Sequence, residues 1–398
     1  MAVAGVIAEY DPFHRGHAWQ LAEIRRRLGE DTAVVVCMSG NFVQRGDFAI
    51  VNKHSRAQMA LHGGADLVLD LPVPWSAATA ERFAQGGVAV LAATGVVTHL
   101  AFGCECGTLR PLQTVARCLD SERCQAGIRR FTVGSMTFAA ARQAAVRELA
   151  GEAAECLSAP NNTLAVEYLR ALRVYGGSIE PLALPRTGAA HNSREPDEYP
   201  SASVIRCRIG MGWDWQTMLP ETSAAVLSRE MEAGRAPVWM SNCQRAVLSQ
   251  LRRMSEEDFR RYDGGNEGLY HRFYNAVHTA INFTDIVLAA KTKRYTRARL
   301  NRMLLQSYLG VPEAAPGETP PYLRVLGFSA RGRLLLREIK KAASLPVLTK
   351  PTHVLRLGRE AQRVLAQEAR CTDLYVLAYP HLLESASGSE YTNGPVML

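Results

Sequence analysis

The first half of the chain alternates short apolar runs with stretches of helical pattern, and this alternation limits the possible folds more than any other feature. The apolar runs lie at residues 2–10, 33–40, 65–72, 99–105 and 178–185, and the helix-like stretches at 17–28, 53–62, 79–94 and 161–175. Each run is apolar enough to be buried on both faces, as strands of a parallel sheet are. The pattern predicts an α/β fold with a doubly wound, Rossmann-like parallel sheet.

The second half of the chain has few strand-like runs. An insertion of helices is expected around 108–158, and helices dominate from residue 211 to about 310. Residues 310–322 are rich in Pro and Gly, which is typical of a linker or long loop, and residues 324–350 could form a small αβ element packed on the helices. A chain of 398 residues can hold two domains. We expect a sheet-containing domain at 1–210 and a mainly helical domain at 211–398.

The composition bears on location and on metal binding. No run of about 18 apolar residues occurs, so no membrane-spanning helix is expected, and the first ten residues lack the basic segment of a secretion signal. The nine cysteines are scattered, as reduced thiols are. Cys104 and Cys106 form a C-x-C, but no second Cys/His pair is evident to complete a zinc site. These features predict a cytoplasmic protein with no metal site.

The net charge of +8 is distributed unevenly. Residues 1–210 hold 21 Lys and Arg against 20 Asp and Glu, whereas residues 211–398 hold 25 against 18. Within the second half, residues 291–302 carry six basic side chains and no acid, which suits a phosphate backbone, although a solvated helix face is the alternative. The candidates for RNA contact are Lys291, Lys293, Arg294, Tyr295 and Arg297, with Tyr295 as a stacking surface.

The turn after the first expected strand holds two histidines, His14 and His17, on either side of Gly16. In a doubly wound sheet this turn is the favoured place for phosphates, but the dinucleotide fingerprint G-x-G-x-x-G is missing. Gly16 lets the backbone approach a ligand, and the two imidazoles offer N–H donors near a helix N-terminus. Such donors suit nucleotidyl transfer, because they stabilise charge that develops on α- and β-phosphate oxygens without acting as bases. Two purely structural histidines are the alternative.

The motif "EYDPFHRGH" resembles the first motif of the nucleotidyltransferase superfamily, which includes class I aminoacyl-tRNA synthetases and pantetheine-phosphate adenylyltransferase. The full series of motifs is more specific than this first motif. It resembles the tRNA(Met) cytidine acetate ligase family from residue 2 to about 375. The motifs that carry this resemblance are "SGNFVQRGDFAIVNKHSRAQMAL", "LVLDLPVPWSAATAERFAQGGVAVL", "FGCE", "PNNTLAVEYLRAL", "SASVIR" and "TKRYTRARLNRM".

The resemblance implies an enzyme that condenses acetate with ATP, in the presence of Mg²⁺, to acetyl-adenylate. The acetyl group then passes to the N4 amine of the wobble cytidine (C34) of elongator tRNA(Met), giving N4-acetylcytidine. His14 and His17 would be the catalytic residues. The implied ATP site comprises Ile7, Ala8, Glu9, Tyr10, Asp11, Pro12, Phe13, His14, Arg15, Gly16, His17, Ala18, Trp19 and Gln20, completed by Gly103, Asn161, Arg186, Ser203 and Arg206.

Two positions depart from the pattern of the family. Asp11 stands where Asn is expected, and Cys104 stands where a small hydroxyl residue is expected. Asp11 places a negative charge near the triphosphate unless its carboxylate binds Mg²⁺ or is turned away.

The remaining motifs allow two interpretations each. Asn161 or Asn162 is expected at a helix N-cap, from which its amide could also reach ribose or adenine. Ser201 and Ser203 are expected at a helix start, with Arg206 one turn on as a phosphate ligand or as a solvated side chain.

Three further basic side chains are open to a similar choice. Arg186 follows the fifth strand, where it could bind a phosphate, stack on adenine or form a surface ion pair. Lys53 and Arg56 share a helix face and could approach the acetate or the tRNA end, or be a solvated pair.

Two other functions compete with the acetate ligase. A small-molecule adenylyltransferase of the pantetheine-phosphate adenylyltransferase type would explain residues 2–210 but would leave the basic second half without a task. A non-catalytic, nucleotide-responsive RNA-binding protein would use the same fold, with Asp11 as the sign of lost chemistry.

Overall fold

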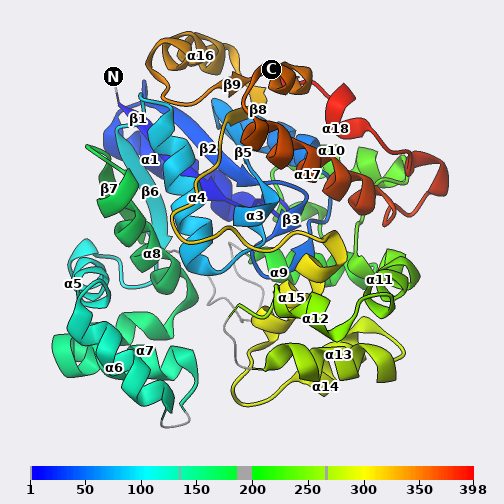
Figure 1. Ribbon diagram of the computed structural model, residues 1–398. Helices are drawn as coiled ribbons and strands as arrows, with labels where there is room; N and C mark the ends of the chain where they lie inside the picture. The colour runs from blue at the N-terminus through cyan, green and yellow to red at the C-terminus, as the bar shows by residue number, and fades with distance from the viewer. Residues whose placement is uncertain (1, 134–135, 186–199, 265–267) are drawn as a thin grey trace.

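A computed structural model describes residues 2–133, 136–185, 200–264 and 268–398 (Figure 1). Five parallel strands form the centre of the main sheet in the order β5-β2-β1-β6-β7. They are β1 (Val3–Ala8), β2 (Ala33–Ser39), β5 (Leu67–Leu71), β6 (His99–Cys104) and β7 (Glu180–Pro185). The five predicted strands and the doubly wound fold class are therefore confirmed. The chain moves outward from β1 to β5 and then returns to the other side of β1, so the strand order reverses between β1 and β6.

Side chains of β1 alternate between two cores, one on each face of the sheet. Val3 and Ile7 belong to one hydrophobic cluster, and Ala4 and Val6 belong to another. The helices that cover these faces begin close to their predicted positions. They are α1 (Arg15–Leu28), α2 (Lys53–His62), α4 (Ala80–Ala93) and α8 (Pro160–Tyr175).

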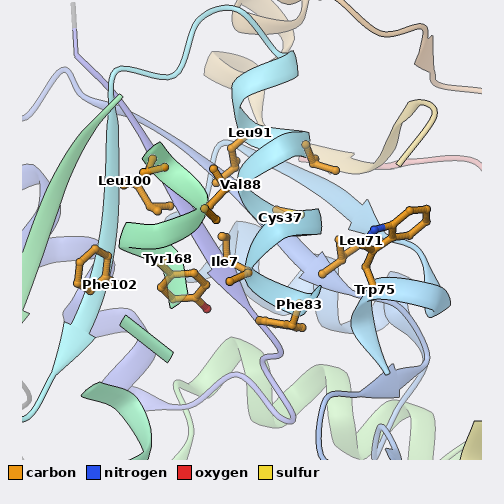
Figure 2. Close-up of a cluster of buried hydrophobic side chains, with 14 of the residues drawn as sticks. Ile7, Cys37, Leu71, Trp75, Phe83, Val88, Leu91, Leu100, Phe102 and Tyr168 are labelled. Atoms are coloured by element: carbon orange, nitrogen blue, oxygen red, sulfur yellow. The ribbon is translucent and has the colours of Figure 1, made fainter. Parts of the chain in front are cut away.

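Helix α4 packs very closely on β1. A methyl group on Gly87 would lie 2.7 Å from the side chain of Ile7, and one on Gly5 would lie 2.8 Å from Leu91. Figure 2 shows Ile7, Val88 and Leu91 meeting Phe83 and Leu100 in this layer. The small residues therefore let the helix and the strand approach each other closely.

The predicted helical insertion is confirmed. Helices α5 (Leu109–Leu119), α6 (Glu122–Val133) and α7 (Phe138–Ala150) lie between β6 and α8 and form a lobe at the lower left of Figure 1.

Helices also dominate residues 202–309, as predicted, and those from α11 onward build a separate core around Leu251, Phe273 and Leu304. The helices are α9 (Ala202–Gly210), α10 (Glu221–Glu232), α11 (Gln244–Arg252), α12 (Glu256–Arg260), α13 (Leu269–Thr279), α14 (Phe283–Ala290) and α15 (Arg297–Leu309). The loop expected at 310–322 carries neither helix nor strand.

Residues 324–350 form a strand and a helix, as predicted, but this αβ element joins the main sheet, whereas packing on the helices was expected. Strand β8 (Leu323–Phe328) joins the main sheet antiparallel to β5, with Val68 opposite Gly327. The added strand covers an otherwise unpaired edge of buried apolar residues. Its companions are β9 (Val347–Leu348), β10 (Val396–Met397), α16 (Ala330–Ala342), α17 (Arg359–Val376) and α18 (Ser389–Thr392). The division at 210/211 stays a prediction, and the sheet itself takes strands from both halves of the chain.

Within the described ranges, no helix is both long enough and apolar enough to cross a membrane.

Candidate nucleotide-binding site

The two histidines form a reciprocal cap on the first turn of α1. The Nδ1 atom of His14 accepts a hydrogen bond from the backbone N–H of Gly16 at 3.1 Å, and Nδ1 of His17 accepts from the backbone N–H of His14 at 3.2 Å. An imidazole whose Nδ1 accepts carries its proton on Nε2. The local backbone therefore sets both rings as Nε2–H donors at a helix N-terminus, where an anion is favoured.

Aromatic packing fixes the orientation of these rings. The rings of His14 and His17 are stacked, with centroids 3.6 Å apart, and the ring of the buried Tyr10 lies 4.7 Å from that of His17. Tyr10 has a φ of 48°, a left-handed conformation that is uncommon for a non-glycine residue and is often found at functional turns. The turn therefore holds its two donors in one arrangement.

Asp11 is turned away from the turn and paired with Arg206 from α9. Its carboxylate accepts the backbone N–H of Ile50 at 2.6 Å and binds Nη1 of Arg206, while Nη2 of Arg206 binds Asp47 at 2.8 Å. The Arg206 guanidinium also lies 4.8 Å from the ring centroid of Trp239. We call Asp11, Asp47 and Arg206 the Arg206 cluster.

The Arg206 cluster changes two expectations. The negative charge of Asp11 is compensated by an arginine, and Arg206 is neither solvated nor aimed freely at a phosphate. Burial lowers the pKa of Arg206, but Asp11 and Asp47 raise it more, so the pKa lies above its usual value and the side chain stays charged. Ser201 is the N-cap of α9, as predicted, and Ser203 is exposed in its first turn.

Residues at the carboxyl end of β6 hold the start of α8. The N-cap of α8 is Ala159, because Pro160 occupies the first helical position, so the prediction that Asn161 or Asn162 is the cap is wrong. The carboxylate of Glu105 instead accepts the backbone N–H of Asn162 at 2.8 Å and the side-chain amide of Asn161 at 2.6 Å. Gly103 lies near the carboxyl end of β6, beside the end of β1. Gly103 and Asn161 therefore both lie at the carboxyl ends of the strands, as predicted.

Lys53 and Arg56 are buried, so they are not a solvated pair, and an approach of either side chain to acetate stays a prediction. Nζ of Lys53 binds Asp70 at 2.7 Å and Glu390 at 2.8 Å. Arg56 donates to the backbone carbonyls of Glu9 and Gly40 and is fully buried. Neither side chain is placed to meet tRNA or solvent, because each is surrounded by backbone or acidic partners.

The charges around Lys53 form a second ionic group, which we call the Lys53 cluster. Its members have side chains that are at most 3% exposed. They are Lys53, Asp70, Arg324, Glu368 and Glu390. The cluster joins α2 and β5 to β8, α17 and α18.

The basic segment 291–302 is only partly as expected. Lys291, Lys293, Arg294 and Arg297 are exposed. Tyr295 is 7% exposed, belongs to the helical core and has the Arg299 guanidinium 5.2 Å from its ring centroid. The prediction that Tyr295 presents a stacking surface for a base is therefore wrong in this conformation, because its ring packs inward.

Arg186, expected in the ATP site, lies outside the described residues. Among the residues that are described, no group of three or more His, Cys, Asp or Glu side chains could hold a metal ion, and Cys104 and Cys106 are free thiols.

The sequence reasoning missed the turn between β2 and α2. Residues 39–47 lie within one of the motifs that carry the family resemblance, but the sequence predicts no contact for them. The backbone N–H of Gln44 binds the carboxylate of Glu9 at 2.6 Å, and Asp47 is a partner of Arg206. Residues 39–47 follow the carboxyl end of β2, which pairs with β1, and this position could have indicated that they lie near the turn after β1.

Comparison with known proteins agrees with this geometry. A family model described as HIGH Nucleotidyl Transferase matches residues 1–390, so the chain belongs to the HIGH nucleotidyl transferases. Curated relatives named tRNA(Met) cytidine acetate ligase are 35% identical in Syntrophomonas wolfei, over 100% of this chain and 99% of the relative, and 35% identical in Acetivibrio thermocellus, over 100% of both.

The solved structure of Thermotoga maritima TmcAL bound with alpha-thio ATP is 30% identical, covers 100% of both chains and has a TM-score of 0.93 to this one. Within the nucleotidyl transferases, the chain belongs to the tRNA(Met) cytidine acetate ligase family, whose members are ligases. The resemblance based on the motifs is thereby confirmed, and a pantetheine-phosphate adenylyltransferase type is not favoured, because the relatives match the C-terminal half as well.

Proposed function

We propose that this protein uses ATP to activate acetate and transfers the acetyl group to N4 of the wobble cytidine of elongator tRNA(Met), in the cytoplasm. The observation that carries the proposal is the pair of Nε2–H donors fixed by the capping box at the start of α1. Full-length relatives that share this substrate name support the identity of the acceptor. The nine free thiols agree with a reducing compartment.

The first half-reaction replaces pyrophosphate with acetate on the α-phosphorus of ATP. A carboxylate oxygen of acetate forms a bond to this phosphorus while the bond to the bridging oxygen of the β-phosphate breaks. Charge grows on oxygens of the α- and β-phosphates during this step. His14 and His17 would donate hydrogen bonds to those oxygens, and donors held in place beforehand lower the barrier because they need not reorganise.

Arg206 would serve the same triphosphate through an exchange of partners. The side chain of Arg206 is 14% exposed, and that of its partner Asp47 is 44% exposed, so solvent reaches this side of the Arg206 cluster. An incoming phosphate could therefore share the guanidinium that these carboxylates now hold. The Asp47 carboxylate released in this exchange would be solvated by water, because its side chain is 44% exposed.

We expect Mg²⁺ to bind at this site only together with the nucleotide. The nearby carboxylates are Asp11 and Asp47, both engaged with Arg206, so most ligands would come from triphosphate oxygens and water, as is usual for Mg²⁺. When bound, the ion would neutralise negative charge on the leaving pyrophosphate.

In the second half-reaction the N4 amine attacks the acetyl carbonyl carbon, AMP leaves and the amine loses a proton. The accepting base must leave its stack to reach the adenylate. The exposed Lys291, Lys293, Arg294 and Arg297 would hold the RNA backbone near the site.

The test is acetate-dependent exchange of labelled pyrophosphate into ATP, with no RNA present. We expect exchange that requires acetate and is not supported by pantetheine phosphate. Exchange with pantetheine phosphate alone would identify a small-molecule adenylyltransferase, and no exchange with any acid would contradict the proposal.

The role of the basic segment is tested by a triple variant, Lys293→Ala with Arg294→Ala and Arg297→Ala. Exchange should persist, whereas tRNA affinity should fall, and the slope of log K against log salt should flatten by roughly 0.7–0.9 for each lost phosphate contact. Undiminished affinity with an unchanged slope would place the RNA surface elsewhere.

A further inference from the structure

A small cavity lies between the β3–β4 turn and the helical core of residues 240–311. It borders Asp47, Trp239, Ser241, Phe283, Arg297 and Asn301, and its volume is about 210 Å³. We call it the hairpin pocket. Pockets for drug-sized ligands measure roughly 300–1,000 Å³, so this one suits a single ring rather than a whole nucleotide.

The turn that forms one wall of the hairpin pocket is held in place by its backbone. β3 (Phe42–Val43) and β4 (Asp47–Phe48) are joined through Gly46, which has a φ of 80°. A methyl group on Gly46 would lie 2.3 Å from the backbone nitrogen of Arg302 in α15. Only glycine permits this approach, so the turn and α15 keep a fixed spacing across the pocket.

The pocket combines aromatic and polar side chains, a combination that suits an unstacked base. Trp239 and Phe283 supply aromatic surface, and Asn301 and Ser241 supply polar groups. The carboxylate of Asp47 accepts hydrogen bonds from Arg206 and from the backbone N–H of Phe48. A carboxylate offers about four acceptor positions, so Asp47 can accept further hydrogen bonds. An exocyclic amino group of cytosine is the donor that a carboxylate reads.

The hairpin pocket also connects the two halves of the proposed reaction. On one side Asp47 is linked through Arg206 to Asp11 in the turn that leads to His14. On the other side Arg297 begins α15 directly after the exposed cations of the basic segment. A base in the pocket would therefore lie between the turn that joins β1 to α1 (residues 9–14), which we call the nucleotide turn, and the cations expected to hold the RNA backbone.

We propose that the hairpin pocket holds the unstacked pyrimidine of the RNA that accepts the acetyl group, with Asp47 accepting a hydrogen bond from its exocyclic amine. The proposal rests on the proposed function and assigns the place of its acceptor. The ring lies against Trp239 and Phe283, while the amine is kept on the side of the pocket nearest Arg206.

A second, larger cavity provides a control. It measures about 420 Å³ and lies at the C-terminal end of α9, beside the exposed indole of Trp213. Its lining residues do not include any member of the Arg206 cluster or of the basic segment.

The experiment compares Phe283→Ala with Trp213→Ala, using an anticodon stem-loop and single-turnover acetyl transfer. Stacking of a base on an aromatic side chain is worth about 1–3 kcal/mol, so Phe283→Ala should slow transfer roughly 5- to 150-fold. Acetate-dependent pyrophosphate exchange should change less than about twofold, which also shows that the variant is folded. Trp213→Ala should leave both reactions unchanged.

A second measurement locates the base in the unmodified protein. A stem-loop with 5-iodocytidine at the accepting position is irradiated in the complex, and the cross-linked peptide is identified by mass spectrometry. An adduct on Trp239 or Phe283 supports the proposal. An adduct on Trp213 or elsewhere outside the hairpin pocket, or normal transfer by Phe283→Ala, overturns it. Loss of exchange in the unmodified protein would instead contradict the proposed function.

Discussion

The Arg206 cluster and the Lys53 cluster both lie at the carboxyl ends of the strands, yet they differ in exposure. Every side chain of the Lys53 cluster is at most 3% exposed, whereas Asp47 in the Arg206 cluster is 44% exposed. A buried ion pair cannot change partners without leaving a charge uncompensated, but a pair at the surface can exchange a carboxylate for an anionic ligand. The Lys53 cluster therefore holds elements of the fold together, whereas the Arg206 cluster can exchange a partner when substrate binds.

The largest effect is expected when the Lys53 cluster loses its central cation. Lys53→Met leaves Asp70 and Glu390 buried without their ammonium partner, and breaking a buried pair costs about 3–5 kcal/mol. Urea unfolding should show this loss. Lys341→Met, which removes an exposed pair with Glu338, is the control and should change stability little. Equal small effects for both variants would mean that the buried cluster does not hold the C-terminal segment.

The next largest effect concerns the donors beside the Arg206 cluster. His14→Ala and His17→Ala should each lower the rate of pyrophosphate exchange about 10²–10³-fold, with a much smaller change in ATP affinity, because the donors act mainly in the transition state. His62→Ala, an exposed histidine at the end of α2, is the control. His14→Ser keeps an N-cap acceptor but removes the ring donor. Normal exchange by His14→Ser would show that His14 only caps the helix.

A smaller effect is expected from the proton held in the Lys53 cluster. Burial raises the pKa of Glu368 to about 8, although Lys53 opposes the shift, so the folded protein keeps a proton that an unfolded carboxyl with a pKa near 4.5 has released. Stability from this group is therefore full below about pH 4.5 and is lost as the pH rises from there through about 8. Glu368→Gln, whose amide oxygen can still accept the N–H of Val73, should remove that part of the slope of melting temperature against pH. An unchanged slope would mean that Glu368 is ionised in the folded protein.

The smallest effect should come from Asp11→Asn in the Arg206 cluster. The amide oxygen can still accept the N–H of Ile50, but one negative charge near the triphosphate is gone and Arg206 keeps only Asp47. The side chains of Asp11 and Arg206 are only 8% and 14% exposed, so the lost charge is weakly screened, and ATP should bind up to about tenfold more tightly (about 1.4 kcal/mol) in equilibrium dialysis. Weaker binding would indicate that Asp11 contacts the nucleotide or its metal directly. Asp70→Asn, the same change in the Lys53 cluster, should instead lower stability.

The nucleotide turn could be predicted from the sequence because its parts are adjacent in the chain. An apolar run, a turn with His14 and His17, and a helical pattern follow one another, and local rules suffice to place them. The exposure of the cations at 291–297 could also be predicted locally, because the segment carries basic residues and no acid.

The two ionic clusters could not be predicted, because their partners are far apart in the sequence. Lys53 and Arg56 share a helix face, but only the fold brings Asp70, Glu368 and Glu390 to Lys53. Strand β8 is short and follows a long loop, and its pairing with β5 spans more than half of the chain. The direction of the Tyr295 ring depends on the packing of the helical core, which a one-sided charge pattern does not reveal.

The proposed reaction is tested by mixing acetate labelled with ¹⁴C with the purified protein, ATP, Mg²⁺ and tRNA. We expect label to enter tRNA only when ATP is present, and mass spectrometry of the nucleosides should find it in N4-acetylcytidine. The amount should be the same without acetyl-coenzyme A. Incorporation that requires acetyl-coenzyme A, or label that enters no tRNA nucleoside while ATP is hydrolysed, would show that the protein is not an acetate ligase acting on tRNA.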